Sequence, residues 1–152
     1  VSFMKYPPVG ERGCAVLRAH SDYRGEPVRE FIEHANAETM VIVQVESAQA
    51  VEHIEEIVSV PGVDAALVGP NDLSIAMGIP GQTDHPKEIE AIESVIAACE
   101  KHGVAAGIHL PDAERLKEWM ARGMQLITWS SDLGLLLGAR RTLESLRAAV
   151  KP

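Results

Sequence analysis

The feature that most constrains the fold is an alternation of short apolar runs with longer amphipathic segments. Four runs are rich in apolar residues, and several contain β-branched side chains, a composition typical of β-strands. The runs span residues 41–46, 64–68, 104–110 and 124–132. Because each run is almost continuously apolar, we predict strands of a parallel sheet that is buried on both faces.

Segments with helical periodicity follow and precede these runs. Residues 1–25 contain three Gly and two Pro, so we expect a loop with at most a short helix there. Ser47 is a residue type that caps helix N-termini, and Gly103 is the type that ends helices. We predict helices over residues 27–38, 47–60, 87–103, 111–123 and 133–150. Residues 71–78 are expected to form a short helix or a loop.

The strand–helix alternation fits two α/β architectures, an open doubly wound sheet and part of a (β/α)8 barrel. Neither GxGxxG nor GxxxxGK[ST] follows a predicted strand, which weakens a nucleotide-binding interpretation. No low-complexity segment or linker interrupts the pattern, so the 152 residues are expected to lie in one domain.

Charge and composition argue against some classes of partner. The chain has 14 Lys and Arg against 22 Asp and Glu, a net charge of −8. It has no basic stripe, so no nucleic acid is expected as a partner. No apolar run approaches the ~20 residues of a membrane span, so no membrane partner is expected either. Cys14 and Cys99 belong to no motif, which predicts a reducing, cytoplasmic location with Cys99 in the core.

Polar side chains gather where the predicted strands end. Gln44 and Glu46 end the first strand, and their spacing of two places both on one face. Asn71 and Asp72 follow the second strand in the sequence GPND. The carboxyl ends of parallel strands share one edge of a sheet, and two carboxylates there suit Mg2+ or Mn2+. The spacing alone leaves two alternatives open, a solvated Glu46 and an Asp72 that caps a helix.

Other residues give weaker signals. His109 ends the third strand and either faces the same edge or is a polar residue at a loop mouth. We expect Asp132 to cap the last helix. We also expect Trp119 and Trp129 to be packing residues rather than platforms for a ligand. Arg12 is expected to form a structural salt bridge rather than to bind an anion.

Four motifs together resemble the HpcH/HpaI aldolase family, the class II pyruvate-dependent aldolases, of which the citrate lyase β-like enzymes are wider relatives. They are YPPVGERG, VQVES, GVDAALVGPNDLSIAMGIPG with a following HP, and GVAAGIH. The resemblance extends from about Tyr6 to Leu137. Its most specific part is the pair Q-x-E and GP-x-DLS, which puts Glu46 and Asp72 26 positions apart.

The resemblance implies a (β/α)8 TIM barrel. A barrel has eight strands and ~250 residues, whereas this chain supplies four predicted strands, which resemble strands five to eight of the family. Residues 1–152 are therefore expected to be the C-terminal part of a single barrel domain. The catalytic His and the substrate-carboxylate Arg of the family would come from the N-terminal part.

The resemblance also assigns roles to residues. Glu46 and Asp72 would bind a divalent cation, Mg2+ or Mn2+ and also Co2+. Gln44 would lie near a metal-bound water or the substrate, as the catalytic residue of this chain. The backbone of Asn71 would help to bind the carboxylate of pyruvate. His109 stands where relatives often have an apolar pocket residue, and it would contact the aldehyde portion of the substrate.

The implied reaction is metal-dependent cleavage or formation of 4-hydroxy-2-oxo acids, giving pyruvate and an aldehyde through an enolate that the metal stabilises. No Schiff-base Lys is needed, and none stands at a predicted strand end. Relatives imply a homo-oligomer, which the apolar last helix would serve. The alternative is a noncatalytic half-barrel that binds a metal or oxo acid, or that assembles with a partner.

Overall fold

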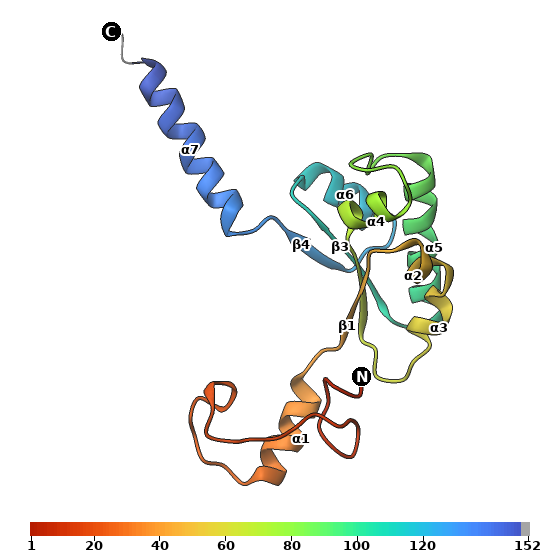
Figure 1. The fold of residues 1–152 in the computed structure, drawn as a ribbon, viewed down its shortest axis with the longest axis vertical. Coiled ribbons are helices and arrows are strands. Elements are labelled where there is room, and N and C mark those ends of the chain that lie inside the picture. The colour runs from red at the N-terminus through yellow and green to blue at the C-terminus, as the bar shows by residue number, and fades with distance from the viewer. Residues whose placement is uncertain (150–152) are drawn as a thin grey trace.

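The computed structural model describes residues 1–149 and contains one sheet of four parallel strands (Figure 1). The spatial order β1-β2-β3-β4 follows the chain without reversal. Neighbouring strands of a barrel have this order, whereas a doubly wound sheet reverses its order at a switch point. The strands are β1 (Ile42–Val45), β2 (Ala65–Val68), β3 (Ala105–Leu110) and β4 (Leu126–Trp129). The predicted α/β class with four parallel strands is thus confirmed, although each strand is shorter than or equal to its apolar run.

Helices connect the strands and extend the chain at both ends. They are the 3-10 helix η1 (Ala19–Ser21) and the α-helices α1 (Val28–Glu38), α2 (Ala48–Glu52), α3 (Ile54–Val58), α4 (Pro70–Ala76), α5 (Pro86–His102), α6 (Ala113–Ala121) and α7 (Asp132–Ala149). Helices α2 to α6 form one layer beside the sheet in Figure 1. The last position of the predicted helix 133–150 lies outside the described residues.

The hydrophobic core lies between the sheet and this helical layer. Val95 and Cys99 on α5 are almost fully buried, as are Val68 on β2 and Ile108 on β3. The pKa of the Cys99 thiol is raised to about 11 by burial, so the predicted core position of this cysteine is confirmed. Helix α5 begins with Pro86 at its first turn and ends at Gly103, whose φ of 67° suits glycine.

The predicted helix 47–60 is wrong in one respect, because the structure divides it into α2 and α3. Ser47 caps α2 as expected, since its hydroxyl accepts a hydrogen bond from the Ala50 amide at 3.1 Å. His53 interrupts the helix with φ −106° and ψ 17°, which lies outside the α region. The periodicity of this segment reflects its packing, because Ile54 and Val58 are both buried.

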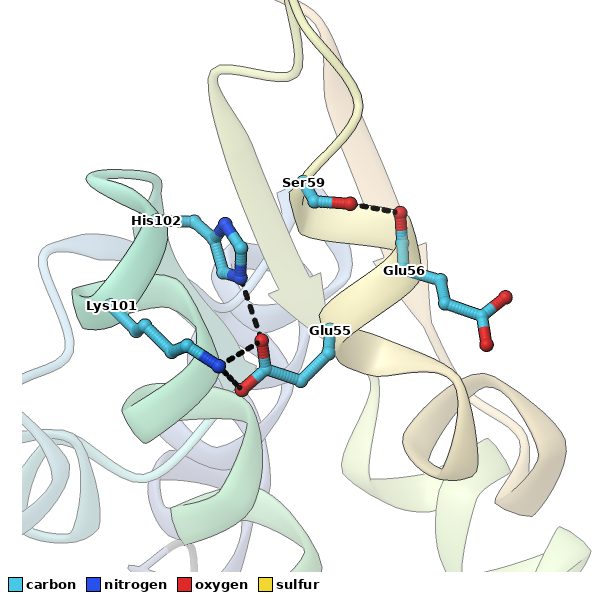
Figure 2. A network of polar contacts seen from close by, with 5 residues as sticks. All are labelled: Glu55, Glu56, Ser59, Lys101 and His102. Carbon is cyan, nitrogen blue, oxygen red and sulfur yellow. Dashed lines mark hydrogen bonds and ion pairs between the residues drawn. The ribbon is translucent and has the colours of Figure 1, made fainter.

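A polar contact joins α3 to the end of α5 (Figure 2). The Glu55 carboxylate accepts from Lys101 Nζ at 2.9 and 3.0 Å and lies 2.6 Å from His102 Nε2. The Lys101 hydrogen bond, followed by that of His102, lowers the pKa of Glu55. Ser59 closes α3 by donating to the Glu56 carbonyl at 2.9 Å. Lys101 and His102 thus link α5 to α3 at the surface, above the apolar contact between the buried residues of α3 and the core face of α5.

The N-terminal segment packs on α1 rather than on the sheet. Tyr6 is buried, and its backbone exchanges two hydrogen bonds with the Asn36 side chain, at 2.7 and 3.0 Å. Phe31 meets the Tyr6 ring edge-on. Arg12 lies over the same ring at 4.8 Å, and no ion pair within residues 1–149 includes it. The predicted salt bridge of Arg12 is therefore wrong, because a cation–π contact takes its place.

The two tryptophans differ. Trp119 is buried on α6 as predicted, whereas Trp129 at the end of β4 is 62% exposed. Its indole nitrogen donates to the Pro111 carbonyl at 3.0 Å. The packing prediction fails for Trp129 because β4 is an edge strand.

Helix α7 leaves the sheet and projects away from the other elements (Figure 1). Asp132 is the first residue of α7, and its carboxylate accepts from the adjacent Leu133 amide at 2.9 Å. An N-cap side chain accepts from the amide two or three residues further on, so the capping role of Asp132 stays a prediction. No described residue of α7 is buried. Among residues 1–149, no helix has the length and apolar character that a membrane crossing requires.

Candidate active site

The candidate site lies at the carboxyl edge of the sheet, where β1 and β2 end side by side. Val45 pairs with Val68 in the parallel ladder, so Glu46 and Gly69 are the next residues on the two chains. Helix α4 starts immediately after Gly69. Two strand ends and one helix start therefore meet at this point.

Gln44 and Glu46 lie on the same face, as their spacing predicted. The Gln44 amide Nε2 donates to Glu46 Oε2 at 2.7 Å. Both residues are exposed, and within residues 1–149 no cationic side chain forms an ion pair with Glu46. The carboxylate is therefore held in place by an amide and has no cationic partner among the described residues.

Gly69 keeps the space beside this pair open. A Cβ atom added there would lie 3.5 Å from Gln44 Nε2 and 3.7 Å from Glu46 Oε2. These are ordinary contact distances, so an alanine would fit, but a longer side chain would displace the amide or the carboxylate. The sequence GPND thus provides an opening next to the acid at the end of β1.

Asp72 lies in the first turn of α4 and is exposed. Gly69 occupies the N-cap position, and no side chain caps this helix, so the alternative that Asp72 is an N-cap is wrong. Ser74, which is buried, anchors this helix. Its hydroxyl donates to the Asn71 carbonyl at 2.7 Å and accepts from the Gly81 amide at 3.0 Å. Asp72 is thus presented on an anchored turn.

The donor set at this edge fits a hard divalent cation. Glu46 and Asp72 would supply carboxylate oxygens, and neither has an ion-pair partner in residues 1–149. Mg2+ and Mn2+ accept few protein carboxylates and complete their shell with water and substrate oxygens. The described residues contain no group of three or more His, Cys, Asp or Glu that could hold a metal, so further ligands would be water or substrate.

His109 lies at the carboxyl end of β3, and its Nδ1 is 2.8 Å from Thr128 Oγ1 on β4. The side chain is exposed and borders a cleft of about 370 Å³ between the ends of β3 and β4 and the start of α7. Asn71 lines the same cleft. We call it the β4–α7 cleft. Asn71 and His109, both predicted to contact the substrate, therefore line the same cleft.

A larger cavity of about 450 Å³ lies at the opposite edge of the sheet, where Val104 and Gln125 precede β3 and β4. Its size does not make it the better candidate, because functional groups of parallel α/β sheets gather at the carboxyl ends of the strands. The β4–α7 cleft lies at the carboxyl ends of β3 and β4.

Glu88 is a fully buried acid near the start of α5, and neither of its carboxyl oxygens has a hydrogen-bond partner. Burial raises the pKa of Glu88 to about 7; the charge of Arg115 lowers the pKa and that of Asp84 raises it. Arg115 is itself engaged with Thr83, through its hydroxyl at 2.6 Å and its carbonyl at 2.7 Å. The sequence analysis did not single out Glu88.

The sequence profile of the HpcH/HpaI aldolase/citrate lyase family matches residues 1–139 of the chain. The chain belongs to this family. The resemblance in its motifs is thereby confirmed, and so is membership of a family of carbon–carbon lyases.

Curated relatives in the HpcH/HpaI family are longer than this chain. The 5-keto-4-deoxy-D-glucarate aldolase of Klebsiella pneumoniae is 36% identical over 146 residues, which cover 94% of this chain and 55% of that protein. The hydroxypyruvate/pyruvate aldolase of Paraburkholderia phytofirmans is 33% identical over 153 residues, covering 97% and 58%. The chain thus spans slightly more than half the length of these relatives.

Solved structures of the family have the same fold. The HpcH/HpaI aldolase of Desulfitobacterium hafniense DCB-2 superposes with a TM-score of 0.87 and 36% identity, over 99% of this chain and 58% of that one. A family protein of Burkholderia cenocepacia J2315 gives a TM-score of 0.84 and 37% identity, over 96% and 58%. The four-stranded unit matches part of each of these structures.

Several residues that surround the site escaped the sequence analysis. Ser74 is part of the DLS motif, and this motif could have indicated that Ser74 anchors the first turn of α4. Thr128 pairs with His109 only because β3 and β4 align these two residues, and the register was not evident from sequence. Arg141 on α7 lines the β4–α7 cleft, and no motif marked it.

Proposed function

We propose that this chain is the C-terminal part, strands five to eight, of a barrel enzyme that cleaves or forms 4-hydroxy-2-oxo acids, giving pyruvate and an aldehyde in a metal-dependent reaction. The observation that carries the proposal is the arrangement of Gln44 and Glu46 beside Gly69 and the anchored first turn of α4. Family membership supports the reaction class. The names of relatives, which include a hydroxypyruvate/pyruvate aldolase, support pyruvate as one product.

Glu46 and Asp72 are the residues that would hold the cation, Mg2+ or Mn2+ and also Co2+. Their charges are not neutralised by any ion pair in residues 1–149, which favours a cation as their partner. When bound, the cation supplies Lewis-acid stabilisation for the negative charge that develops on the keto oxygen of the substrate.

The remaining residues of the site would bind and orient the substrate. The Gln44 Nε2 group donates to Glu46, which leaves Gln44 Oε1 to accept from a water or a substrate hydroxyl. Asn71, in the first turn of α4, is placed to bind the carboxylate of pyruvate through its backbone. His109 would contact the aldehyde portion, with its ring orientation fixed by Thr128.

Cleavage requires a base to remove the proton of the C4 hydroxyl. The C3–C4 bond then breaks, the aldehyde carbonyl forms, and the electron pair moves into the enolate of pyruvate, which later takes a proton at C3. Formation of the 4-hydroxy-2-oxo acid is the reverse. We expect the base, a His, and an Arg for the substrate carboxylate to come from the first four strand–helix units.

A noncatalytic half-barrel is the second candidate, and the uncovered sheet edges favour it. Ile42 on β1 is 44% exposed and Trp129 on β4 is 62% exposed, surfaces that an added partner would cover. Cys14 and Cys99 are unpaired, which supports a reducing cytoplasmic location for either candidate.

Pyruvate release by the polypeptide of the full reading frame distinguishes the two candidates. A 4-hydroxy-2-oxo acid is supplied with Mn2+, and pyruvate is measured by coupled reduction to lactate. The enzyme proposal predicts that Glu46→Gln abolishes pyruvate release. The control variant Glu52→Gln, which changes an exposed acid on α2, should release pyruvate as the parent does. A reading frame without upstream strand–helix units, or a parent that releases no pyruvate, would favour the noncatalytic module. Release that is equal in both variants would contradict the role proposed for Glu46.

A further inference from the structure

Arg115 on α6 holds the segment that connects α4 to α5. Its Nη1 donates to the Thr83 hydroxyl at 2.6 Å, and its Nη2 donates to the Thr83 carbonyl at 2.7 Å. An arginine that binds two oxygen atoms of one residue fixes both the position and the orientation of that residue. Arg115 and Thr83 therefore form a clamp between α6 and residues 77–85, which we call the α4–α5 loop.

The α4–α5 loop is also bound to the helix that carries Asp72. The Gly81 amide donates to the Ser74 hydroxyl at 3.0 Å, and this hydroxyl donates to the Asn71 carbonyl at 2.7 Å. Gly81 lies close to Thr83 in the loop. A continuous series of contacts therefore leads from the clamp on α6 to the first turn of α4.

Glu88 is a buried acid that the clamp leaves without a partner. It lies in the first turn of α5, as Arg115 does in α6. Neither of its carboxyl oxygens has a hydrogen-bond partner. An ionised carboxylate in such a place gains most from a nearby cation, because an unpaired buried charge costs free energy. Arg115 is that cation, since its charge lowers the pKa of Glu88.

The other charged or titratable groups around Glu88 do not take the place of Arg115. Asp84 in the loop is an acid, and its charge raises the pKa of Glu88. Helix α4 packs against α5, and its charged residue Asp72 is an exposed acid. The ring of His85 accepts from a backbone amide as the N-cap of α5. Arg115 therefore has two alternative partners, the loop and the Glu88 carboxylate.

We propose that Arg115 is a positioning residue for the proposed metal site and that ionised Glu88 draws it away from Thr83. Protonated Glu88 leaves the clamp in place, so the loop anchors the turn that presents Asp72. Ionised Glu88 pairs with the guanidinium, which releases the loop and lowers the affinity of the site for a cation. This inference rests on the proposed function. Because the pKa of Glu88 is about 7, cation affinity should be lost as the pH rises through this value.

Nuclear magnetic resonance tests the exchange of partners on the 152-residue chain without metal. The Nε–Hε signal of Arg115 should shift with a midpoint near pH 7. The Gly81 amide proton should move upfield with the same midpoint, as its hydrogen bond to Ser74 weakens. Glu88→Gln should abolish both shifts, whereas Glu90→Gln, at an exposed acid of α5, should keep them. Shifts that are absent in the folded parent, or that persist in Glu88→Gln, would overturn the proposal.

Calorimetric titration with Mn2+ at pH 6 and pH 8 tests the positioning role. The parent should bind Mn2+ at least ~5-fold more weakly at pH 8, the lower end of the usual coupling between two sites. Arg115→Met should bind at pH 6 as weakly as the parent does at pH 8, and Glu88→Gln should bind equally at both pH values. Lys117→Met, which removes an exposed positive charge from α6, is the matched control and should behave as the parent does.

The two measurements separate this inference from the proposed function, and circular dichroism of each sample verifies that the chain is folded. Mn2+ affinity that is equal at pH 6 and pH 8 in the parent overturns the positioning role and leaves the metal site standing. A folded parent that binds Mn2+ at neither pH overturns the proposed function, whatever the signal of Arg115 does. A loss of affinity with rising pH that persists in Glu88→Gln overturns the role of Glu88. Both shifts and the loss of affinity, all abolished in Glu88→Gln, support the whole account.

Discussion

Glu46 and Glu88 are two acids in opposite environments. Glu46 is exposed and held by the Gln44 amide, so its charge is available to a cation. Glu88 is buried without a hydrogen-bond partner, and its pKa is raised to about 7. A buried charge without a partner costs free energy, which is why burial favours the protonated form of Glu88 in the folded chain below about pH 7.

Glu88 should make the stability of the chain fall as pH rises. The folded chain keeps this proton up to about pH 7, whereas the unfolded chain releases it near 4.5, the ordinary pKa of a glutamate. The unfolded state therefore binds fewer protons between these values, and the free energy of unfolding decreases by about 3 kcal/mol across the window. Glu88→Gln should flatten this dependence and stabilise the chain at pH 8, as measured by urea unfolding from pH 4 to 8. Glu90→Gln, at an exposed acid on α5, should keep the wild-type slope, and parallel curves for wild type and Glu88→Gln would contradict the assignment.

At the scale of elements, the stability of the chain depends on the residues that end its helices. Gly103 ends α5 with a φ of 67°, and this helix contributes much of the core. Gly103→Ala should lower the free energy of unfolding by about 1 kcal/mol, because a Cβ is strained in the left-handed region. Gly138→Ala on α7 is the control, since α7 buries no described residue; thermal unfolding monitored by circular dichroism should show no loss for it. An equal loss in both variants would contradict the role given to Gly103.

The elements differ in how well sequence predicts them. The strands β1 and β3 lie within the apolar runs VIVQVE and VAAGIHL and differ from them by one residue at one or both ends, because burial on both faces leaves a local signature in the sequence. The break at His53 and the exposure of Trp129 depend on neighbouring elements, so neither was predictable from residue type. The same is true of the site: the spacing of Gln44 and Glu46 predicted their shared face, whereas the burial of Glu88 follows from tertiary packing.

At the scale of the molecule, the chain exposes apolar surface that a complete barrel or a partner would cover. Leu135 is 76% exposed on α7, Leu136 is 65% exposed and Leu146 is 61% exposed. Surfaces of this kind drive association. We expect the isolated chain to self-associate at micromolar concentration in sedimentation velocity experiments. Leu135→Glu combined with Leu146→Glu should shift it toward the monomer, whereas Arg140→Glu should have little effect; a wild-type chain that remains monomeric would contradict this expectation.

The central claim is that Glu46 and Asp72 together bind one divalent cation, and the most direct test is calorimetric titration of the chain with Mn2+, with and without pyruvate. The account predicts saturable binding that pyruvate tightens. It also predicts that Glu46→Gln and Asp72→Asn each weaken binding at least ~10-fold, and that Glu52→Gln does not. Circular dichroism of each sample verifies that the chain is folded. A folded wild-type chain that binds no Mn2+, or variants that bind it as tightly as wild type, would contradict the account.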